Sequence, residues 1–240
     1  MNLLKQLLLR MAGAVSRDNE SKVVFYHDLY ASSPLTSMAT PLSLFGDHIE
    51  AAARVGYRFV TSLDAPVRQA QVCLDDGFAG IWECRGFFQG LNWRPTVFLA
   101  VELIGKPGYL SRAQILELQK DGFRFQSHGW SHCPLTEVSP EVLPRETADA
   151  RHWLEDMLGV EVTEICFPVG MFSPRVLEAC RAAGYARMYS SIPGSFKREL
   201  FPCVVRRNLV QFYGPAEFQA VLRGGLAPFA GYYRRMHFVP

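Results

Sequence analysis

The sequence has no long hydrophobic run and no closely spaced pair of cysteines. No apolar stretch reaches the about 20 residues of a transmembrane helix, which excludes a predicted spanning segment. None of the six cysteines forms a CxxC motif, and most lie in apolar runs, where a free thiol packs as a small hydrophobic group. The apolar run between Lys5 and Arg10, Leu7–Leu9, is too short for the core of a secretory leader. Together with reduced cysteines, this predicts a cytoplasmic protein.

The chain also has little net charge. The formal value of +2 gives no overall signature of nucleic-acid binding, and we expect no nucleic-acid partner. The charge is unevenly distributed, however. Residues 181–240 carry nine Lys or Arg and only two Asp or Glu. This basic last quarter suits an anionic substrate or a membrane surface, and an ordinary solvated face is the alternative interpretation.

The composition and the order of predicted elements indicate one enzyme-like domain. The 240 residues are 49% hydrophobic, which is enough for a large core. Predicted strands and helices alternate along the chain, without an internal repeat. We therefore expect an α/β fold: a distorted (β/α) barrel with about seven parallel strands in a single domain. The barrel should span residues 22–222, after an N-terminal helix and linker (1–21) and before an aromatic and basic tail (223–240).

The N-terminal segment has the pattern of a short amphipathic helix. Its apolar residues fall on one helical face; they are Leu3, Leu4, Leu7, Leu8 and Met11. Such a face either packs on the body of the protein or lies on a membrane. We expect packing on the body, and peripheral membrane contact is the alternative.

Reactive side chains follow several predicted strands. His27, Asp75, Asp76 and His128 each come directly after one, and such residues meet at the mouth of a parallel barrel. Adjacent ionised carboxylates repel each other, so Asp75 and Asp76 favour a nearby cation. His128 and His132 are four residues apart, and if the segment between them makes one helical turn, both imidazoles point to the same side. Two histidines and one carboxylate indicate a hydrolytic metal site, with the second carboxylate as general base.

At these residues the sequence resembles the polysaccharide deacetylases, the carbohydrate esterases with a NodB-homology domain. Leu74-Asp75-Asp76-Gly77 is similar to the family's Phe-Asp-Asp-Gly motif. His128-Gly129-Trp130-Ser131-His132 is similar to its His-x-x-Ser/Thr-His motif, and Phe167-Pro168-Val169-Gly170 to its Pro-Tyr-Gly turn. Phe25-Tyr26-His27-Asp28 resembles the family's last motif moved to the front, as in a circularly permuted subgroup.

The resemblance implies a role for each matching residue. Asp75 would be the general base. A divalent metal ion, zinc in the usual case, would be held by Asp76, His128 and His132. The backbone N–H of Val169 would stabilise the oxyanion, and His27 would be the general acid.

The resemblance also implies substrate contacts and shows departures from the motifs. Phe25 would line the pocket for the acyl methyl group. No tryptophan clearly matches the family's sugar-stacking motif, so Tyr189 and Tyr213 are candidates for contact with the sugar. We expect Trp130 to pack beside the metal, and contact with the sugar is the alternative. Cys166 occupies the position of an arginine that braces the catalytic aspartate in many members, and Val169 replaces the usual tyrosine.

The implied reaction is metal-dependent hydrolysis of an N-acyl group, acetyl in the usual case, on an amino sugar. A cytoplasmic location favours a lipid-linked or nucleotide-linked precursor of an envelope polysaccharide over the finished polymer. Two alternatives remain: a non-catalytic sugar-binding or scaffold protein, and a hydrolase of cyclic amides or imides. The sequence leaves the oligomeric state open.

Overall fold

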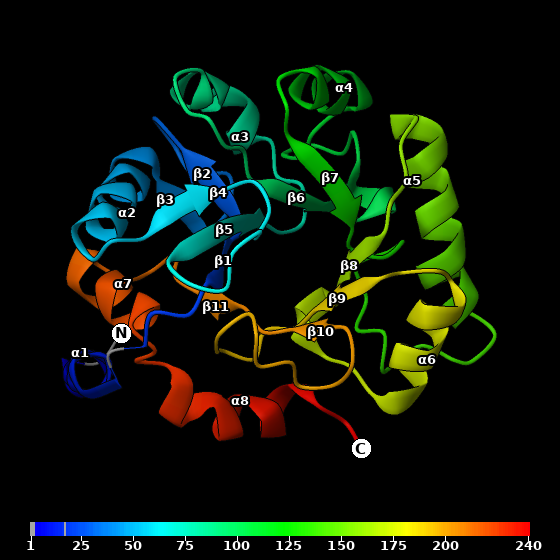
Figure 1. Cartoon of the computed structure of the whole chain (residues 1–240). Coiled ribbons are helices and arrows are strands. Elements are labelled where there is room, and N and C mark those ends of the chain that lie inside the picture. Colours follow the sequence, from blue (N-terminus) through cyan, green and yellow to red (C-terminus); the bar gives the residue numbers. More distant parts are fainter. Residues whose placement is uncertain (1–2, 17) are drawn as a thin grey trace.

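A curled parallel sheet forms the centre of the molecule, and the computed structural model describes residues 3–16 and 18–240 (Figure 1). All strand pairs in this nine-stranded sheet are parallel, and its order is β10-β9-β8-β7-β6-β5-β1-β11, with β4 also paired to β5. The strands are β1 (Lys22–Tyr26), β4 (Arg58–Val60), β5 (Gln69–Leu74), β6 (Thr96–Leu99), β7 (Arg124–Ser127), β8 (Glu164–Cys166), β9 (Arg187–Tyr189), β10 (Val204–Val205) and β11 (Asn208–Leu209). The predicted α/β barrel fold is confirmed.

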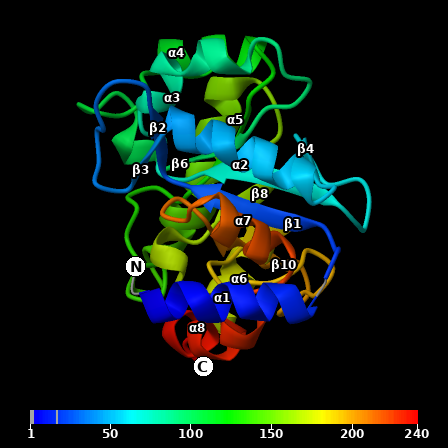
Figure 2. The ribbon, with the colours of Figure 1, turned by 90° about the vertical axis from the view of Figure 1, so that its left-hand side faces the viewer.

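Helices surround the outside of the sheet, and two more lie along its lower side (Figures 1 and 2). The helices are α1 (Leu3–Ser16), α2 (Leu42–Arg54), α3 (Gly80–Glu83), α4 (Arg112–Lys120), α5 (Ala150–Leu158), α6 (Pro174–Ala182), α7 (Pro215–Leu222) and α8 (Ala230–His237). Their apolar faces and the outer face of the sheet form the larger core cluster. A separate small cluster fills the barrel interior; it comprises Val23, Phe25, Leu63, Cys73, Phe98, Cys166, Tyr189 and Val205.

The two edges of the sheet are consecutive in the chain. Only Arg206 and Arg207 separate β10 from β11, so the curled sheet comes almost full circle at this pair of arginines. No ladder joins these two edge strands in the described chain. A charged pair inside an apolar stretch, Val204–Val210, therefore marks the seam of the barrel.

Local differences from the expected elements have simple causes. The apolar pattern predicts one strand over Val204–Val210, but the structure splits it at the seam, which raises the strand number above seven. The Ser-, Thr- and Pro-rich segment Ala31–Pro41 predicts a loop, but its end forms β3 (Ala39–Pro41), which pairs with β2 (Asp28–Tyr30) in a separate small parallel sheet. The sequence predicts one long helix over Ser139–Leu158, where the structure has a π-helical turn, Arg145–Asp149, followed by α5.

Helix α1 packs in a different orientation from the one we expected. Only a narrow strip of it faces α7: Leu9 is 2% exposed, and Gly13 lies directly against Ala220. The face predicted to pack on the body is exposed instead, at Leu4, Leu7, Leu8 and Met11. That prediction was wrong, because the contact uses a small residue that lets two backbones approach rather than the leucine-rich face. The side chain of Leu3 lies outside the described part. No helix of the described chain is both long and apolar enough to cross a bilayer.

The close contact at Gly13 gives a stability prediction. A Cβ at Gly13 would lie 2.7 Å from both the Cα and the carbonyl O of Ala220, so Gly13→Ala must push the two helices apart. We expect a loss of about 1–3 kcal/mol in the free energy of unfolding, or release of α1 from the body. Urea unfolding and limited trypsin cleavage at Arg10 measure the two outcomes.

Gly46→Ala, within α2, is the matched control. A Cβ there meets nothing within 4 Å, so the same change should stabilise the protein by about 0.5–1 kcal/mol through helix propensity. Equal stability and equal trypsin resistance of the two variants would show that α1 does not depend on close packing at Gly13.

Candidate active site

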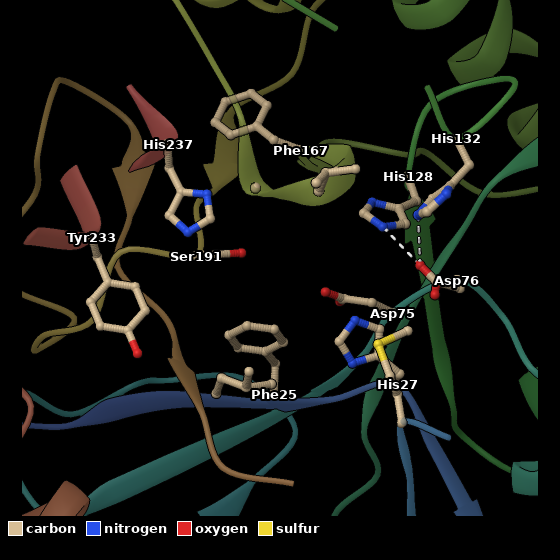
Figure 3. A pocket seen from close by; sticks show the side chains of 14 residues that line it. Phe25, His27, Asp75, Asp76, His128, His132, Phe167, Ser191, Tyr233 and His237 are labelled. Carbon is tan, nitrogen blue, oxygen red and sulfur yellow. Dashed lines mark ion pairs between the residues drawn. The ribbon is translucent and has the colours of Figure 1, made fainter. Parts of the chain in front are cut away.

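A cavity of about 300 Å³ opens at the carboxyl ends of the strands (Figure 3). Several elements far apart in the sequence line it, including β1, β5, the segment after β7, the turn after β8, and α8. The lining residues are Phe25, His27, Met38, Asp75, Asp76, His128, His132, Phe167, Val169, Gly170, Ser191, Leu209, Tyr233 and His237. Seven of the residues singled out from the sequence are therefore in one pocket.

Asp76, His128 and His132 converge on one point of the cavity wall. Asp76 Oδ1 lies 3.1 Å from His128 Nε2 and 2.9 Å from His132 Nε2 (Figure 3). This oxygen is buried, and neither contact has the geometry of a hydrogen bond. His128 Nδ1 lies 2.8 Å from the carbonyl O of Cys166, to which it donates. That bond fixes the tautomer in which Nε2 presents its lone pair toward Asp76.

The backbone adopts unusual conformations at this site. Asp76 and His132 have φ values of 71° and 66°, in the left-handed region that Asp and His tolerate better than most residues. Val169 has a φ of 57°, which is strained for a β-branched residue. Such outliers concentrate at functional sites, where the surrounding fold holds them in place. Each of these three turns directs the chain around the cavity wall.

Glu146 holds the segment between the two histidines. Its buried carboxylate accepts hydrogen bonds from the backbone N–H of Trp130 and of Ser131, each at 3.0 Å, and from Ser131 Oγ at 2.7 Å. Gly129, with a φ of 80°, passes close to this carboxylate, and a Cβ there would lie 3.3 Å from Glu146 Oε2. The glycine in the motif is therefore required by backbone conformation and space.

The donor set at Asp76 fits a divalent metal ion. Two imidazole nitrogens and one carboxylate oxygen suit zinc in hydrolytic sites, where further coordination positions stay open. The orphaned Asp76 Oδ1 is the observation that supports this, since a buried carboxylate oxygen without a hydrogen-bond donor calls for a cation. Burial raises the pKa of Asp76, but the two histidines outweigh burial and lower that pKa. Its contact with Asp76 raises the pKa of His132.

A second group of possible ligands, Asp75, His128 and Cys166, also lies close together. Its donor atoms are already used. Arg207 Nη1 and Nη2 donate to Asp75 Oδ1 at 2.7 Å and Oδ2 at 2.9 Å, and Nη2 lies 2.8 Å from Cys166 Sγ. Burial raises the pKa of the Cys166 thiol well above its usual value, which disfavours the thiolate that a metal binds. The Asp76 group is therefore the better metal site.

Asp75 forms a buried bidentate ion pair with Arg207. Arg207 is fully buried, and its guanidinium also packs 4.2 Å from the ring of Phe25. Burial raises the pKa of Asp75, but the charge and hydrogen bonds of Arg207, together with the nearby His128 and His27, outweigh burial, so the pKa is lowered. Asp75 is therefore held ionised and oriented beside the metal site, as a general base requires.

Arg207 corrects our view that Asp75 lacks a bracing arginine. The cation comes from the seam of the barrel rather than from position 166. Its guanidinium occupies space that the small side chain of Cys166 leaves open, and Cys166 Sγ lies 3.6 Å from Asp75 Oδ2. One signal in the sequence pointed to it, since an arginine within an apolar strand needs a buried counter-charge.

His27 lies beside Asp75 in the same pocket (Figure 3). Strand β1 pairs with β5, which places the residues after the two strands next to each other. His27 Nδ1 lies 2.6 Å from Oε1 of the buried Gln211. An amide oxygen only accepts hydrogen bonds, so Nδ1 donates, and Nε2 is left to face the cavity. Gln211 is a positioning residue that the motifs did not reveal.

The opposite wall of the cavity comes from α8 and the segment after β9. Figure 3 shows Tyr233, His237 and Ser191 facing Asp75 and the two metal-site histidines across the pocket. Burial lowers the pKa of His237, which favours its neutral form. Residues at the two ends of the chain, His27 and His237, therefore face one cavity.

Two predicted substrate contacts lie outside the pocket. Tyr189 is fully buried in the barrel interior, where its hydroxyl donates to Glu164 Oε2 at 3.1 Å. Its assignment as a sugar contact was wrong, because the side chain points into the barrel interior instead of toward solvent. Trp130 is partly exposed and does not line the cavity; its indole N–H donates to Glu102 Oε1 at 3.0 Å.

Comparison with known proteins identifies the family. A barrel mouth with an Asp-His-His group and a separate braced aspartate is typical of metal-dependent hydrolases. The polysaccharide deacetylase family model matches residues 64–188, just over half of the chain. The chain belongs to the polysaccharide deacetylase family.

Individual relatives are distant. The chain is 23% identical over 188 residues to the putative polysaccharide deacetylase YxkH of Bacillus subtilis. The match covers 74% of this chain and 66% of the relative, so this chain spans slightly less than two thirds of the relative's length. The fold is similar to that of Streptococcus pyogenes deacetylase PplD, solved with acetate (TM-score 0.74, 18% identity, 85% of this chain and 98% of that one). IcaB from Ammonifex degensii is equally similar (TM-score 0.74, 20% identity, 86% and 98%).

The Asp75–Arg207 pair gives a second stability prediction. Arg207→Met leaves a buried carboxylate without its cation, so we expect a loss of about 3–5 kcal/mol in unfolding free energy at neutral pH. Arg206→Met, next to it, is the matched control and should cost much less. Because the pKa of Asp75 is lowered in the folded protein, the stabilisation is full above a pH of about 4 and is lost as the pH falls further. Denaturation at several pH values measures the difference.

Relocating the arginine tests the correction directly. Cys166→Arg alone places a second guanidinium against Arg207 and should destabilise the protein. The double variant Cys166→Arg, Arg207→Met restores one cation beside Asp75 and should recover at least half of the loss. A double variant no more stable than Arg207→Met would show that position 166 cannot supply the brace.

Proposed function

We propose that this protein is a metal-dependent hydrolase that removes an N-acyl group, acetyl in the simplest case, from an amino sugar. The proposal rests on one observation: a single pocket holds two sets of residues with different roles. Asp76, His128 and His132 form a metal-binding group, while Asp75 and His27 lie beside it with their orientations fixed by Arg207 and Gln211. A metal-dependent hydrolysis needs both sets of residues.

The metal ion would be held by Asp76, His128 and His132, and we propose zinc from the nitrogen-rich donor set. When bound, such an ion supplies a Lewis acid that acidifies water and polarises a carbonyl group. The protein itself contributes a cavity with room for a water molecule and the acyl group. Phe25 lines the same cavity and offers an apolar surface to a methyl group.

The side chains divide the proton transfers. In the overall reaction, R–NH–CO–CH₃ and H₂O give R–NH₂ and CH₃COOH; the C–N bond breaks and a C–O bond forms. Asp75 takes a proton from the attacking water. The backbone N–H of Val169 stabilises the negative charge that develops on the carbonyl oxygen. His27 gives a proton to the leaving nitrogen, so the product departs as an amine.

Position favours His27 over His237 as the acid. His27 lies beside Asp75, whereas His237 lies on the far wall (Figure 3). The hydrogen bond to Gln211 also fixes the ring of His27, with Nε2 toward the cavity. We assign His237, with Tyr233 and Ser191, to contacts with the remainder of the sugar.

The size of the cavity suits a single sugar residue better than a long chain. About 300 Å³ lies at the lower end of small-molecule pockets. We therefore propose a lipid-linked or nucleotide-linked amino-sugar precursor as the substrate. Action in the cytoplasm is part of this proposal and is motivated by six free cysteines. The non-catalytic scaffold alternative rests on the missing arginine and the missing tyrosine of the motifs; Arg207 supplies a cation in place of the arginine, while Val169 still replaces the tyrosine.

Removing the base and removing a metal ligand should have different effects. We expect Asp75→Asn to keep its metal and to release acetate from N-acetylglucosamine conjugates at least about 100-fold more slowly. His132→Ala should lose both metal and activity. Elemental analysis and an acetate assay on zinc-loaded protein measure the two quantities. Undiminished activity of Asp75→Asn would exclude Asp75 as the base.

The two pocket histidines should differ in the kinetic constant that they affect. His27→Ala should lower kcat by a factor of about 100 or more, because an amine is a poor leaving group without an acid. An acetyl ester with a phenolic leaving group needs no such acid and should restore most of the rate. His237→Ala should raise KM with little change in kcat. The assignment fails if His237→Ala shows the kcat loss and the ester rescue instead.

A further inference from the structure

Helix α1 presents its most apolar face away from the protein. At 3.6 residues per turn, Leu7, Leu8, Met11 and Val15 lie within an arc of about 100°. Their exposed fractions run from 44% for Leu8 to 84% for Val15. The residues that contact the body, Leu9 and Gly13, lie on the opposite side of the helix. An isolated amphipathic helix is expected to bury its apolar face, so this exposure calls for an external partner.

Helix α8 lies beside α1 and has two functional faces. Both views show the two helices along the same lower side of the molecule (Figures 1 and 2). Tyr233 and His237, four residues apart, line the catalytic cavity. Tyr232 and Met236, one residue earlier in each case, are 64% and 51% exposed. The exposed face of α8, about 100° around the helix from the residues that line the cavity, therefore adds apolar surface next to a wall of the active site.

A groove joins the two helices into one surface. It contains side chains from α1, from α8 and from the segments before and after α7; they are Lys5, Leu9, Tyr213, Leu226, Phe229, Tyr232 and Tyr233. Tyr233 lines both this groove and the catalytic cavity. We call the exposed residues of α1 and α8, together with this groove, the α1–α8 surface.

The charges on the α1–α8 surface have one sign. The α1 residues 3–16 contain Lys5 and Arg10 and no acidic residue, and the α8 residues 230–237 contain Arg234 and Arg235 and no acidic residue. Among the described residues, only Arg10 of these four pairs with a carboxylate, that of Glu217 on α7. Apolar side chains flanked by cations are the pattern of a helix that lies in the interface of an anionic membrane.

We propose that the α1–α8 surface docks the protein on an anionic lipid bilayer and holds the catalytic cavity beside the lipid head groups. The substrate is then an amino sugar attached to a membrane lipid, a choice that rests on the proposed deacetylase function. Because α8 forms both the docking face and a wall of the cavity, a docked molecule has its active site next to the plane where such a sugar lies.

A second copy of the chain fits this surface less well than a bilayer. A twofold dimer would place the same patch against itself. Three cations from each copy without a carboxylate partner among the described residues, Lys5, Arg234 and Arg235, would then meet in one interface, which costs free energy. An anionic bilayer accepts both the apolar side chains and the cations.

Vesicle flotation tests docking independently of catalysis. We expect the full chain and Asp75→Asn to float equally with vesicles of phosphatidylglycerol and phosphatidylcholine, and far less with phosphatidylcholine alone. The double variant Leu8→Glu, Met11→Glu should bind at least about tenfold more weakly, and so should Lys5→Glu, Arg235→Glu. Val142→Glu, Val160→Glu changes two exposed valines elsewhere on the molecule and should bind like the unmodified protein.

Catalysis on two forms of one substrate tests the consequence. With an N-acetylglucosamine lipid in anionic vesicles, Leu8→Glu, Met11→Glu should lower kcat/KM at least about tenfold. With a soluble short-chain analogue, the same variant should match the unmodified protein. No hydrolysis of either substrate by the unmodified protein, with flotation intact, would reject the proposed function and leave docking supported.

Two results would overturn docking itself. One is flotation of the unmodified protein no greater than that of Leu8→Glu, Met11→Glu. The other is a dimer, measured by light scattering, that these substitutions dissociate while vesicle binding is absent. The second result would identify the α1–α8 surface as a self-association interface.

Discussion

The buried pair between Asp75 and Arg207 is the interaction on which the candidate site depends. Ionised Asp75 and Asp76 are neighbours, and each needs its own cation for the fold to tolerate both. Arg207 satisfies Asp75 through two hydrogen bonds, while Asp76 faces two imidazoles. This partition leaves Asp75 free to handle a proton and Asp76 free to bind a metal. It also stabilises the seam of the barrel, because Arg207 lies between the two edge strands.

The sequence predicted the fold class and the residues at the strand ends, because both depend on local patterns. Alternating strands and helices require a parallel sheet, and residues after parallel strands share one edge. His27, Asp75, Asp76, His128 and His132 could therefore be assigned to one pocket from their places after the predicted strands alone. The single glycine of the histidine motif, Gly129, also follows a local rule, since its backbone needs a positive φ.

The remaining features of the site could not be predicted, because they depend on contacts between residues that are far apart in the sequence. Arg207 reaches Asp75 only because β10 and β11 come to the seam, 132 residues further along the chain. The same applies to Gln211, which orients His27, and to Glu146, which supports the turn before His132. Tyr189 was misplaced because a strand residue can face the barrel interior below the pocket. The outward face of α1 was missed because one small residue, Gly13, decided which side packs.

The place of His27, directly after the first strand, has a structural consequence. The last segment of the described chain does not have to supply the candidate acid. The terminal segment instead forms α8, which closes the cavity with Tyr233 and His237 and exposes apolar residues on its other side. One helix, α8, therefore forms part of the pocket and part of the outer surface of the protein.

Anomalous diffraction at the zinc edge from crystals grown with zinc tests the central claim most directly. The account predicts one peak at about 2.0–2.2 Å from Asp76, His128 and His132, with Asp75 still paired to Arg207. A peak bound by Asp75 and Cys166 instead would contradict it, because the residue assigned as the free base would then be a metal ligand.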